Sequence, residues 1–261
     1  MEPAPSGEQA GGAQPPVTAP SRRPAGDHRR LTAAVEVLLC SGVPTQLLIG
    51  QTLGLAGHEP FVEGVPQSGP LFALALLDSL ALIGLILLLL RLHGERPALV
   101  FLGHRPVGRE TTLGLLLVPA LLVGVTLTVW LVRTILPWMQ NVQVNPFERL
   151  IQSPGEAALF ALVATVAGGL REEIQRAFLL RRFEQHLGGP IVGLIVVSGA
   201  FGAGHALQGW DAAVVTGLLG ATWGLLYLRR RSIVAPVVSH AGYNVMQVAQ
   251  VLILRKFAPT A

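Results

Sequence analysis

The sequence predicts an all-α protein, a polytopic transmembrane helical bundle of about seven spans, on three observations. Apolar residues make up 51% of the 261 residues and charged residues only 13%. The mean hydropathy is +0.55, whereas a soluble domain usually carries about 25% charged residues. The apolar residues also gather in long Leu-rich segments without the alternation of a lipid-facing barrel. This composition argues against a soluble enzyme and a disordered protein.

The elements follow in order. Residues 1–30 form a polar preface rich in Pro and Gly with no apolar run, so we expect a disordered segment and no signal peptide. Seven apolar segments follow, at 31–57, 70–92, 112–137, 155–180, 190–208, 211–228 and 232–254. Most approach the ~20 residues that a membrane-spanning helix needs. The fourth should continue as a charged helix to residue 187. We therefore divide the chain into residues 1–30, 31–154, 155–254 and a short tail, 255–261.

The basic residues predict the orientation of these crossings. Of the 19 Lys and Arg residues, four precede the first segment, four lie between the second and third, four lie at the end of the fourth, and three lie between the sixth and seventh. Because cytoplasmic loops carry an excess of Lys and Arg, we expect a multi-pass protein of the bacterial inner membrane with a cytoplasmic N-terminus. Charge spread over four loops also argues against nucleic acid as a partner. The lone Cys40 excludes an intramolecular disulfide. We expect the four tryptophans to contact the bilayer and to have no other role.

Ionisable residues inside apolar segments are functional candidates by default. Two acids of the first half, Glu36 and Asp78, are interpreted as helix-pairing residues. The second half instead holds three pairs at i, i+4, a spacing that puts both members on one helix face. These pairs are Glu172 with Arg176, Phe201 with His205, and His240 with Asn244.

A register argument joins the fourth and fifth segments. Glu172 lies 16 residues before Gly188, and His205 lies 16 residues after Gly189. Across a helical hairpin these two side chains should be level, about 24 Å from the turn. A carboxylate and an imidazole can hold and deprotonate a water. A second imidazole and an amide, from His240 and Asn244, can stabilise an oxyanion.

At these residues the sequence resembles the CPBP or ABI family of intramembrane glutamic proteases, which process CAAX tails and bacteriocins. The family carries EExxxR, FxxxH and HxxxN motifs on successive helices, and the resemblance makes 155–254 a CAAX-protease-like catalytic core. The first motif here is one residue short. Counting back from Arg176 puts Arg171 in the place of the catalytic glutamate, whereas counting from the Glu-Glu pair puts Glu172 there. The hairpin register favours Glu172.

The resemblance implies an intramembrane endopeptidase acting on a membrane-bound peptide or protein. It assigns the water to Glu172 and His205, the oxyanion to His240 and Asn244, and orienting roles to Glu173 and Arg176. No cofactor or metal is expected, although Glu172, His205 and His240 could supply the three ligands of a catalytic zinc. Three alternatives stay open: that zinc enzyme, a proton-coupled transporter, and a catalytically inactive immunity or scaffold protein of the same fold.

Overall fold

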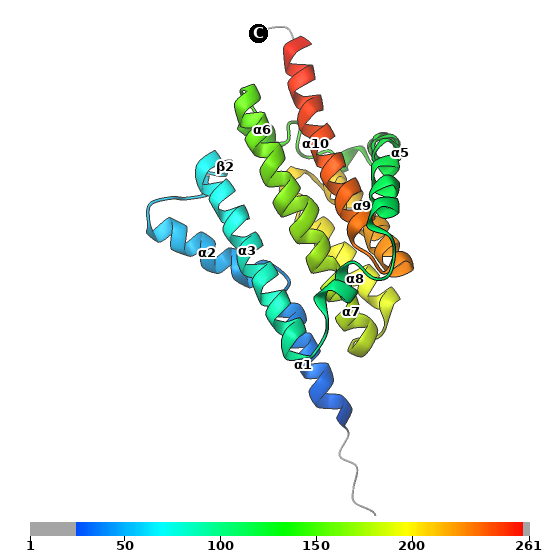
Figure 1. The fold of residues 1–261 in the computed structure, drawn as a ribbon. Helices are drawn as coiled ribbons and strands as arrows, with labels where there is room; N and C mark the ends of the chain where they lie inside the picture. Colours follow the sequence, from blue (N-terminus) through cyan, green and yellow to red (C-terminus); the bar gives the residue numbers. More distant parts are fainter. Residues whose placement is uncertain (1–24, 258–261) are drawn as a thin grey trace, which may run out of the picture.

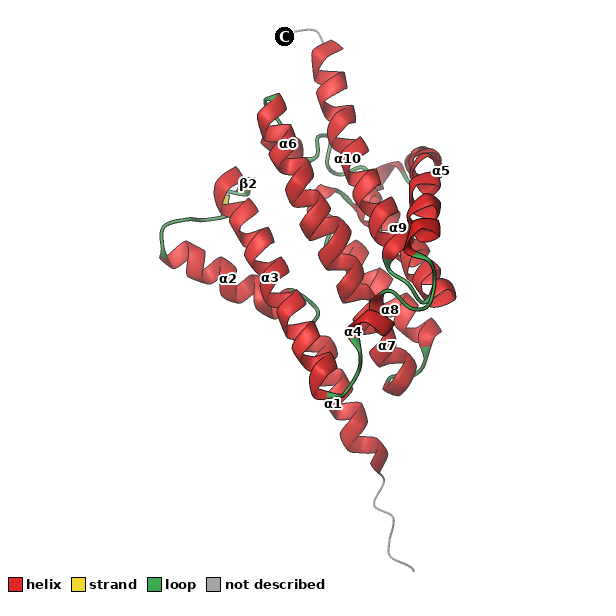
Figure 2. Ribbon diagram, in the orientation of Figure 1, coloured by secondary structure: helices red, strands yellow, loops and turns green. Residues whose placement is uncertain are grey.

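The computed structural model describes residues 25–257, and this part of the chain is an all-α bundle (Figures 1 and 2). A two-residue hairpin, β1 (Phe61–Val62) with β2 (Val65–Pro66), interrupts the helices. The helices are α1 (Ala25–Leu39), α2 (Val43–Leu55), α3 (Ser68–Leu92), α4 (Pro97–Phe101), α5 (Val107–Ile135), α6 (Pro154–Val163), α7 (Glu172–His186), α8 (Pro190–Ala203), α9 (Trp210–Arg230) and α10 (Val234–Phe257). Three 3₁₀ turns, η1 (Pro137–Met139), η2 (Pro146–Leu150) and η4 (Ala206–Gln208), and a π-helix, η3 (Ala164–Arg171), complete the order. Most of the predicted preface lies outside the described residues, and α1 already begins at Ala25.

Five stretches of the described chain are long and apolar enough to cross a membrane: His28–Leu55, Ser68–Leu92, Val107–Ile135, Trp210–Arg230 and Val234–Phe257. Several such stretches in one chain are typical of an integral multi-pass membrane protein. Each predicted segment corresponds to helical structure, but two segments differ from a single straight helix. The first breaks between α1 and α2, where Gly42 adopts a φ of 87° that favours glycine.

The fifth predicted segment ends earlier than expected. Helix α8 stops at Ala203, after 14 residues, so the prediction of a helix to residue 208 is wrong. Gly202 and Gly204 flank its last residue, and the chain then turns through η4. His205 consequently lies in a turn beyond the helix. The apolar run alone could not reveal this end, because His205 and Gln208 are preceded by an uninterrupted hydrophobic stretch.

The fourth predicted segment is one continuous helical rod formed by α6, η3 and α7. Its start is set by Ser153, whose hydroxyl accepts from the backbone N–H of Glu156, and by Pro154 in the first turn. The π-helix ends directly before the two adjacent glutamates. Because a π-turn contains more residues than an α-turn, it changes the direction in which the following side chains point.

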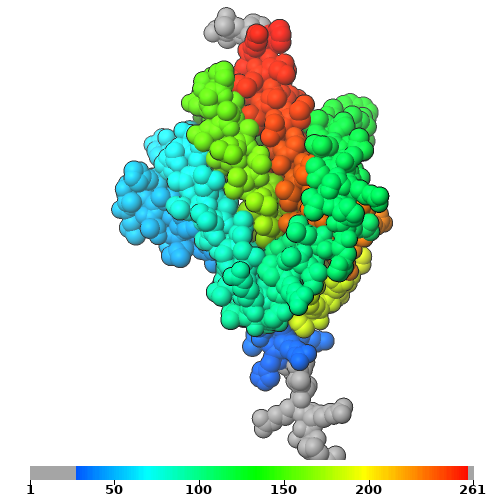
Figure 3. All heavy atoms as spheres, in the orientation of Figure 1, coloured from blue at the N-terminus to red at the C-terminus, as the bar shows by residue number. Residues whose placement is uncertain are grey.

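The two ends of the bundle are built differently. At the end that holds the α7–α8 turn, the buried core includes Leu82, Ile86, Leu90, Phe178, Leu180 and Tyr227. Basic residues close this end, with Arg231 bound to Glu184 and Arg105 donating to the carbonyl of Arg230. We call it the basic end. The opposite end carries the 137–151 loop, the start of α6 and the end of α10; α6 and α10 lie at the surface in Figure 3.

Two buried ion pairs connect the first half of the chain to the fourth segment. Asp78 of α3 accepts from Arg171 at 2.5 Å, and Glu36 of α1 accepts from Arg182 at 2.5 Å. Asp78 also accepts from the Thr45 hydroxyl. The two acids therefore pair helices, as the sequence predicted, and they constrain the rotation of α7.

Candidate active site

His240 is the centre of the site. It lies on α10 and is 4% exposed. Its Nδ1 is 2.8 Å from Oε1 of Glu173, and its Nε2 is 3.8 Å from Oε2 of Glu172. The ring stacks on Trp223 of α9, with centroids 3.7 Å apart and planes inclined by 14°. One imidazole is thus held by α7 on its edge and by α9 on its face.

The two glutamates differ in their access to water. The side chain of Glu173 is 1% exposed and is also paired with Arg176, which is itself buried. The Arg176 guanidinium lies 4.5 Å from the centre of the Phe201 ring. The Glu172 side chain keeps 20% of its surface exposed and makes no direct hydrogen bond to His240 at 3.8 Å. Glu173 is therefore fixed in place, whereas the side chain of Glu172 is partly exposed and less constrained.

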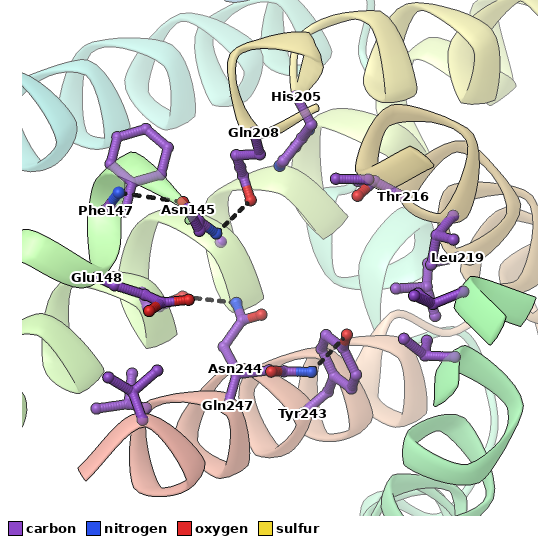
Figure 4. A pocket seen from close by; sticks show the side chains of 18 of the residues that line it. Asn145, Phe147, Glu148, His205, Gln208, Thr216, Leu219, Tyr243, Asn244 and Gln247 are labelled. Carbon is purple, nitrogen blue, oxygen red and sulfur yellow. Dashed lines mark hydrogen bonds between the residues drawn. The ribbon is translucent and has the colours of Figure 1, made fainter. Parts of the chain in front are cut away.

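His205 approaches from the other side of the site. Its Nδ1 is 2.8 Å from the carbonyl oxygen of Phe201, and the two rings are 4.8 Å apart. A carbonyl can only accept, so Nδ1 carries the proton in this bond and Nε2 of the neutral ring is left as an acceptor. Figure 4 shows the side chain pointing into the cavity.

The expected pairing of Glu172 with His205 has a different geometry from the one that the hairpin register suggested. Within residues 25–257, the ion-pair contacts of Glu172 and Glu173 to histidine all go to His240. The register argument treats both segments as regular α-helices. In the structure His205 has left α8, and η3 turns the glutamates before α7 begins.

A cavity of about 460 Å³ contains the predicted His205, His240 and Asn244 in its wall (Figure 4). Asn244 donates through Nδ2 to the carbonyl of Ala164, 3.2 Å away in the π-helix. A Cβ atom on Gly168 would lie 2.5 Å from that nitrogen, so glycine lets the asparagine pack against η3. Glu172 and Glu173 are not among the described residues that line the cavity; they approach it from behind His240.

The described residues do not fit the three-ligand zinc site that the sequence left open. No group of three His, Cys, Asp or Glu side chains between residues 25 and 257 is close enough to hold one metal ion. A catalytic zinc needs its protein ligands within about 2.0–2.3 Å of the metal. Here His240 contacts both glutamates, and His205 is bonded to a backbone carbonyl instead.

Several residues of the site were not found from the sequence. Trp223 is 1% exposed and stacks on His240, so its interpretation as a residue that needs only the bilayer is wrong. Its position in the middle of the sixth segment, away from either interface, was an available signal. The mouth of the cavity is also polar: Asn145 donates to Gln208 at 3.1 Å, and Glu148 lies beside them in the wall (Figure 4).

The fold and the site together define a membrane-embedded helical protein with a carboxylate–imidazole centre beside a cavity. Over residues 154–246 the chain matches the family model described as Type II CAAX prenyl endopeptidase Rce1-like. This match confirms the family resemblance and gives that segment the fold of an intramembrane CAAX-type protease. No curated protein and no solved structure matches the chain.

Proposed function

We propose that the protein is an intramembrane endopeptidase that hydrolyses a peptide bond of a membrane-associated peptide or protein with a water activated by Glu172. One observation carries the proposal: His240, in the wall of a cavity, lies 3.8 Å from a partly exposed glutamate, Glu172, and 2.8 Å from a buried one, Glu173. Because this nitrogen and oxygen are too far apart for a direct hydrogen bond, both can bind one water that lies to the side of the pair.

Each residue has a separate role in the proposed reaction. Glu172 takes a proton from the water as general base and later gives it to the leaving amine. The free Nε2 of His205 helps to orient the water from across the cavity. Glu173 and Arg176 are positioning residues, because their contacts fix the ring of His240.

The oxyanion of the tetrahedral intermediate is proposed to be stabilised by His240 and Asn244. An asparagine amide has two N–H donors, and only one is used on the Ala164 carbonyl. Protonated His240 would donate from both ring nitrogens, with the carboxylate of Glu173 stabilising its charge. Donors placed where charge develops are worth about 10²–10³ in rate.

The test is cleavage of a membrane-peptide library in liposomes by the wild type and by Glu172→Gln. The wild type should cleave, with and without a strong chelator, and the variant should not. If chelation stops cleavage and added zinc restores it, the glutamate mechanism is wrong.

The second candidate is a catalytically inactive immunity or scaffold protein of the same fold. The observation that favours it is the short motif: Arg176 pairs with Glu173 at i, i+3, and neither glutamate lines the cavity. In that case the wild type and Glu172→Gln would be equally inactive on every peptide, while both remain folded. The proton-coupled transporter has no comparable observation in its favour.

The proposed location is the bacterial inner membrane with the N-terminus in the cytoplasm. The distribution of arginines between the ends of the bundle supports it. A cysteine introduced near Glu63 should react with an impermeant reagent from outside the cell, and one near Arg105 should not. The reverse pattern would invert the topology.

A further inference from the structure

We infer that the cavity opens on the non-cytoplasmic side of the membrane, so that the substrate is a membrane-anchored polypeptide cut from that side rather than a cytoplasmic tail. That the occupant of the cavity is a substrate rests on the proposed function. The direction of the opening depends only on the cavity, the core and the charges.

The cavity belongs to one half of the bundle. Its wall comes from the second half of α5, residues 211–223 of α9, residues 240–251 of α10, the end of α8 with η4, and the 142–151 loop. The first half of α5 is closed against α10, where a Cβ on Gly114 would lie 2.6 Å from Cβ of Val238. The opening is therefore at the end opposite the basic end.

The site is separated from the basic end by packed core. Along α9, Trp223 beside His240 is followed one turn later by Tyr227, which is 3% exposed and donates to the carbonyl of Val100. Along α7, Arg176 is followed by Phe178 and Leu180, both fully buried. A second cavity of about 430 Å³ does exist at the basic end, beside Glu36 and Arg182. It shares no lining residue with the first.

The charges assign these ends to the two sides of the membrane. Among the described residues, the basic end holds Arg91, Arg96, Arg105, Arg109, Arg181, Arg182, Arg229, Arg230 and Arg231. The opposite end holds Arg133, Arg149, Arg255 and Lys256, and Arg133 is neutralised by Asp211 at 2.7 Å. The excess of arginine places the basic end in the cytoplasm and the mouth of the cavity outside it.

The length and the lining of the cavity indicate what kind of ligand it can hold. Asp211 at the mouth and Trp223 at the floor are 12 positions apart on α9, about 18 Å along the helix. An extended chain spans about 3.3–3.6 Å per residue, so about five residues reach from mouth to floor. Much of the wall between them is apolar, with side chains from three helices: Val125, Val129, Val215, Leu219, Val248 and Val251. The occupant is an extended apolar stretch that follows a polar junction on the outer surface.

The experiment measures access in intact cells with a charged, impermeant maleimide on single-cysteine variants in a Cys40→Ala background. Thr216→Cys lies in the cavity wall. Thr222→Cys is the matched control, since it is on the same helix, exposed, and outside the cavity. Arg96→Cys reports the basic end.

Thr216→Cys should react in intact cells, Thr222→Cys should stay unlabelled in the bilayer, and Arg96→Cys should react only after permeabilisation. Reaction of Thr216→Cys only after permeabilisation, or no reaction in either state, would overturn the inference. A second measurement follows the peptide library in liposomes: maleimide on Thr216→Cys should abolish cleavage, and maleimide on Arg96→Cys should not. Absent cleavage by the wild type would reject the proposed function, while the labelling would still decide the side of the opening.

Discussion

The two halves of this bundle use the same kinds of residue for opposite purposes. In the basic half, aromatic and aliphatic side chains such as Phe178 and Tyr227 pack into a buried core. In the other half, Val129 and Leu219 line a cavity of about 460 Å³. Hydropathy cannot distinguish these halves. What differs is the surroundings of the polar groups: His205 and Asn244 face the cavity in the hollow half, whereas the buried Arg182 of the basic half is paired with Glu36.

The candidate site lies where the packed half of the bundle meets the hollow half. His240 lies in the cavity wall, and Glu172 approaches it from behind, on the side of the core. The core fixes the side chains, and the cavity would supply the water that the proposed hydrolysis needs and that lipid excludes. Disturbing either half should therefore have a distinct signature.

The largest effect on activity should come from substitutions at the glutamates beside His240. Glu172→Gln should reduce cleavage of the membrane-peptide library by about 10²–10⁴-fold, the range of a lost general base. Its far-ultraviolet circular dichroism should not change, since the side chain is partly exposed and holds no direct hydrogen bond among the described residues. Glu173→Gln is the matched control. It should unfold more easily, by about 3–5 kcal/mol, because it leaves Arg176 buried without its partner. Equal stability of the two variants would contradict the division of roles.

The next effect compares the packed and hollow halves directly. Phe178→Ala should lower the free energy of unfolding by about 3–5 kcal/mol, because a fully buried ring leaves a void. Val129→Ala, in the cavity wall, should change it by about 0.5 kcal/mol or less, since the lost contact opens onto space already present. Denaturant unfolding in detergent measures both. Similar losses for the two variants would mean that the cavity half is packed as well.

Substituting glycines at a packed and at an open position should give smaller changes in stability, of opposite sign. Gly169→Ala should destabilise the protein by about 1–3 kcal/mol, because the new methyl group would lie 2.8 Å from Cβ of Ala241 and α10 would have to move. Gly124→Ala in α5 has no neighbouring atom within 4 Å and should instead stabilise the helix by about 0.5–1 kcal/mol. Thermal unfolding of the two variants gives opposite signs if the packing is as described.

The smallest effect belongs to the surface of the basic end. Glu184 accepts two hydrogen bonds from Arg231, and these lower the pKa of its carboxyl. The pair is half-exposed, so Glu184→Gln should cost only about 0.2–1 kcal/mol. Because the folded-state pKa is depressed, the contribution is present above the ordinary glutamate pKa and is lost as the pH falls through the lowered value. The stability difference between wild type and variant should vanish in acid and persist at neutral pH. A difference that grows in acid would refute this assignment.

Much of the fold follows from the sequence because hydropathy alone sets the positions of the long helices. α3, α5, α9 and α10 lie where the apolar segments predict them. The break at Gly42 and the end of α8 at Ala203 depend on backbone angles and on the packing of neighbours, which an apolar run does not reveal. The π-helix is hidden for the same reason.

The site is only partly encoded in spacing. Motif order brings His205, His240 and Asn244 into one cavity wall, and the sequence identified all three. Its assignment of the water to Glu172 stays a prediction, because the direction of both glutamates depends on η3 and on Arg171, whose partner Asp78 is 93 positions away. That contact is three-dimensional, and nothing in the local pattern of the fourth segment indicates it.

The ion pairs that Asp78 and Glu36 make with the fourth segment mean that the segment matching the family does not fold independently of the rest of the chain. Residues 154–246 match the family, yet Arg171 and Arg182 inside that segment are neutralised by acids outside it. A graft of the segment alone onto another scaffold would leave two buried guanidinium groups without counter-ions. The rotation of the glutamates would then no longer be fixed. The smallest transplantable piece must therefore include α1 and α3 along with the family segment, and a chimera that omits them should misfold before its chemistry can be assayed.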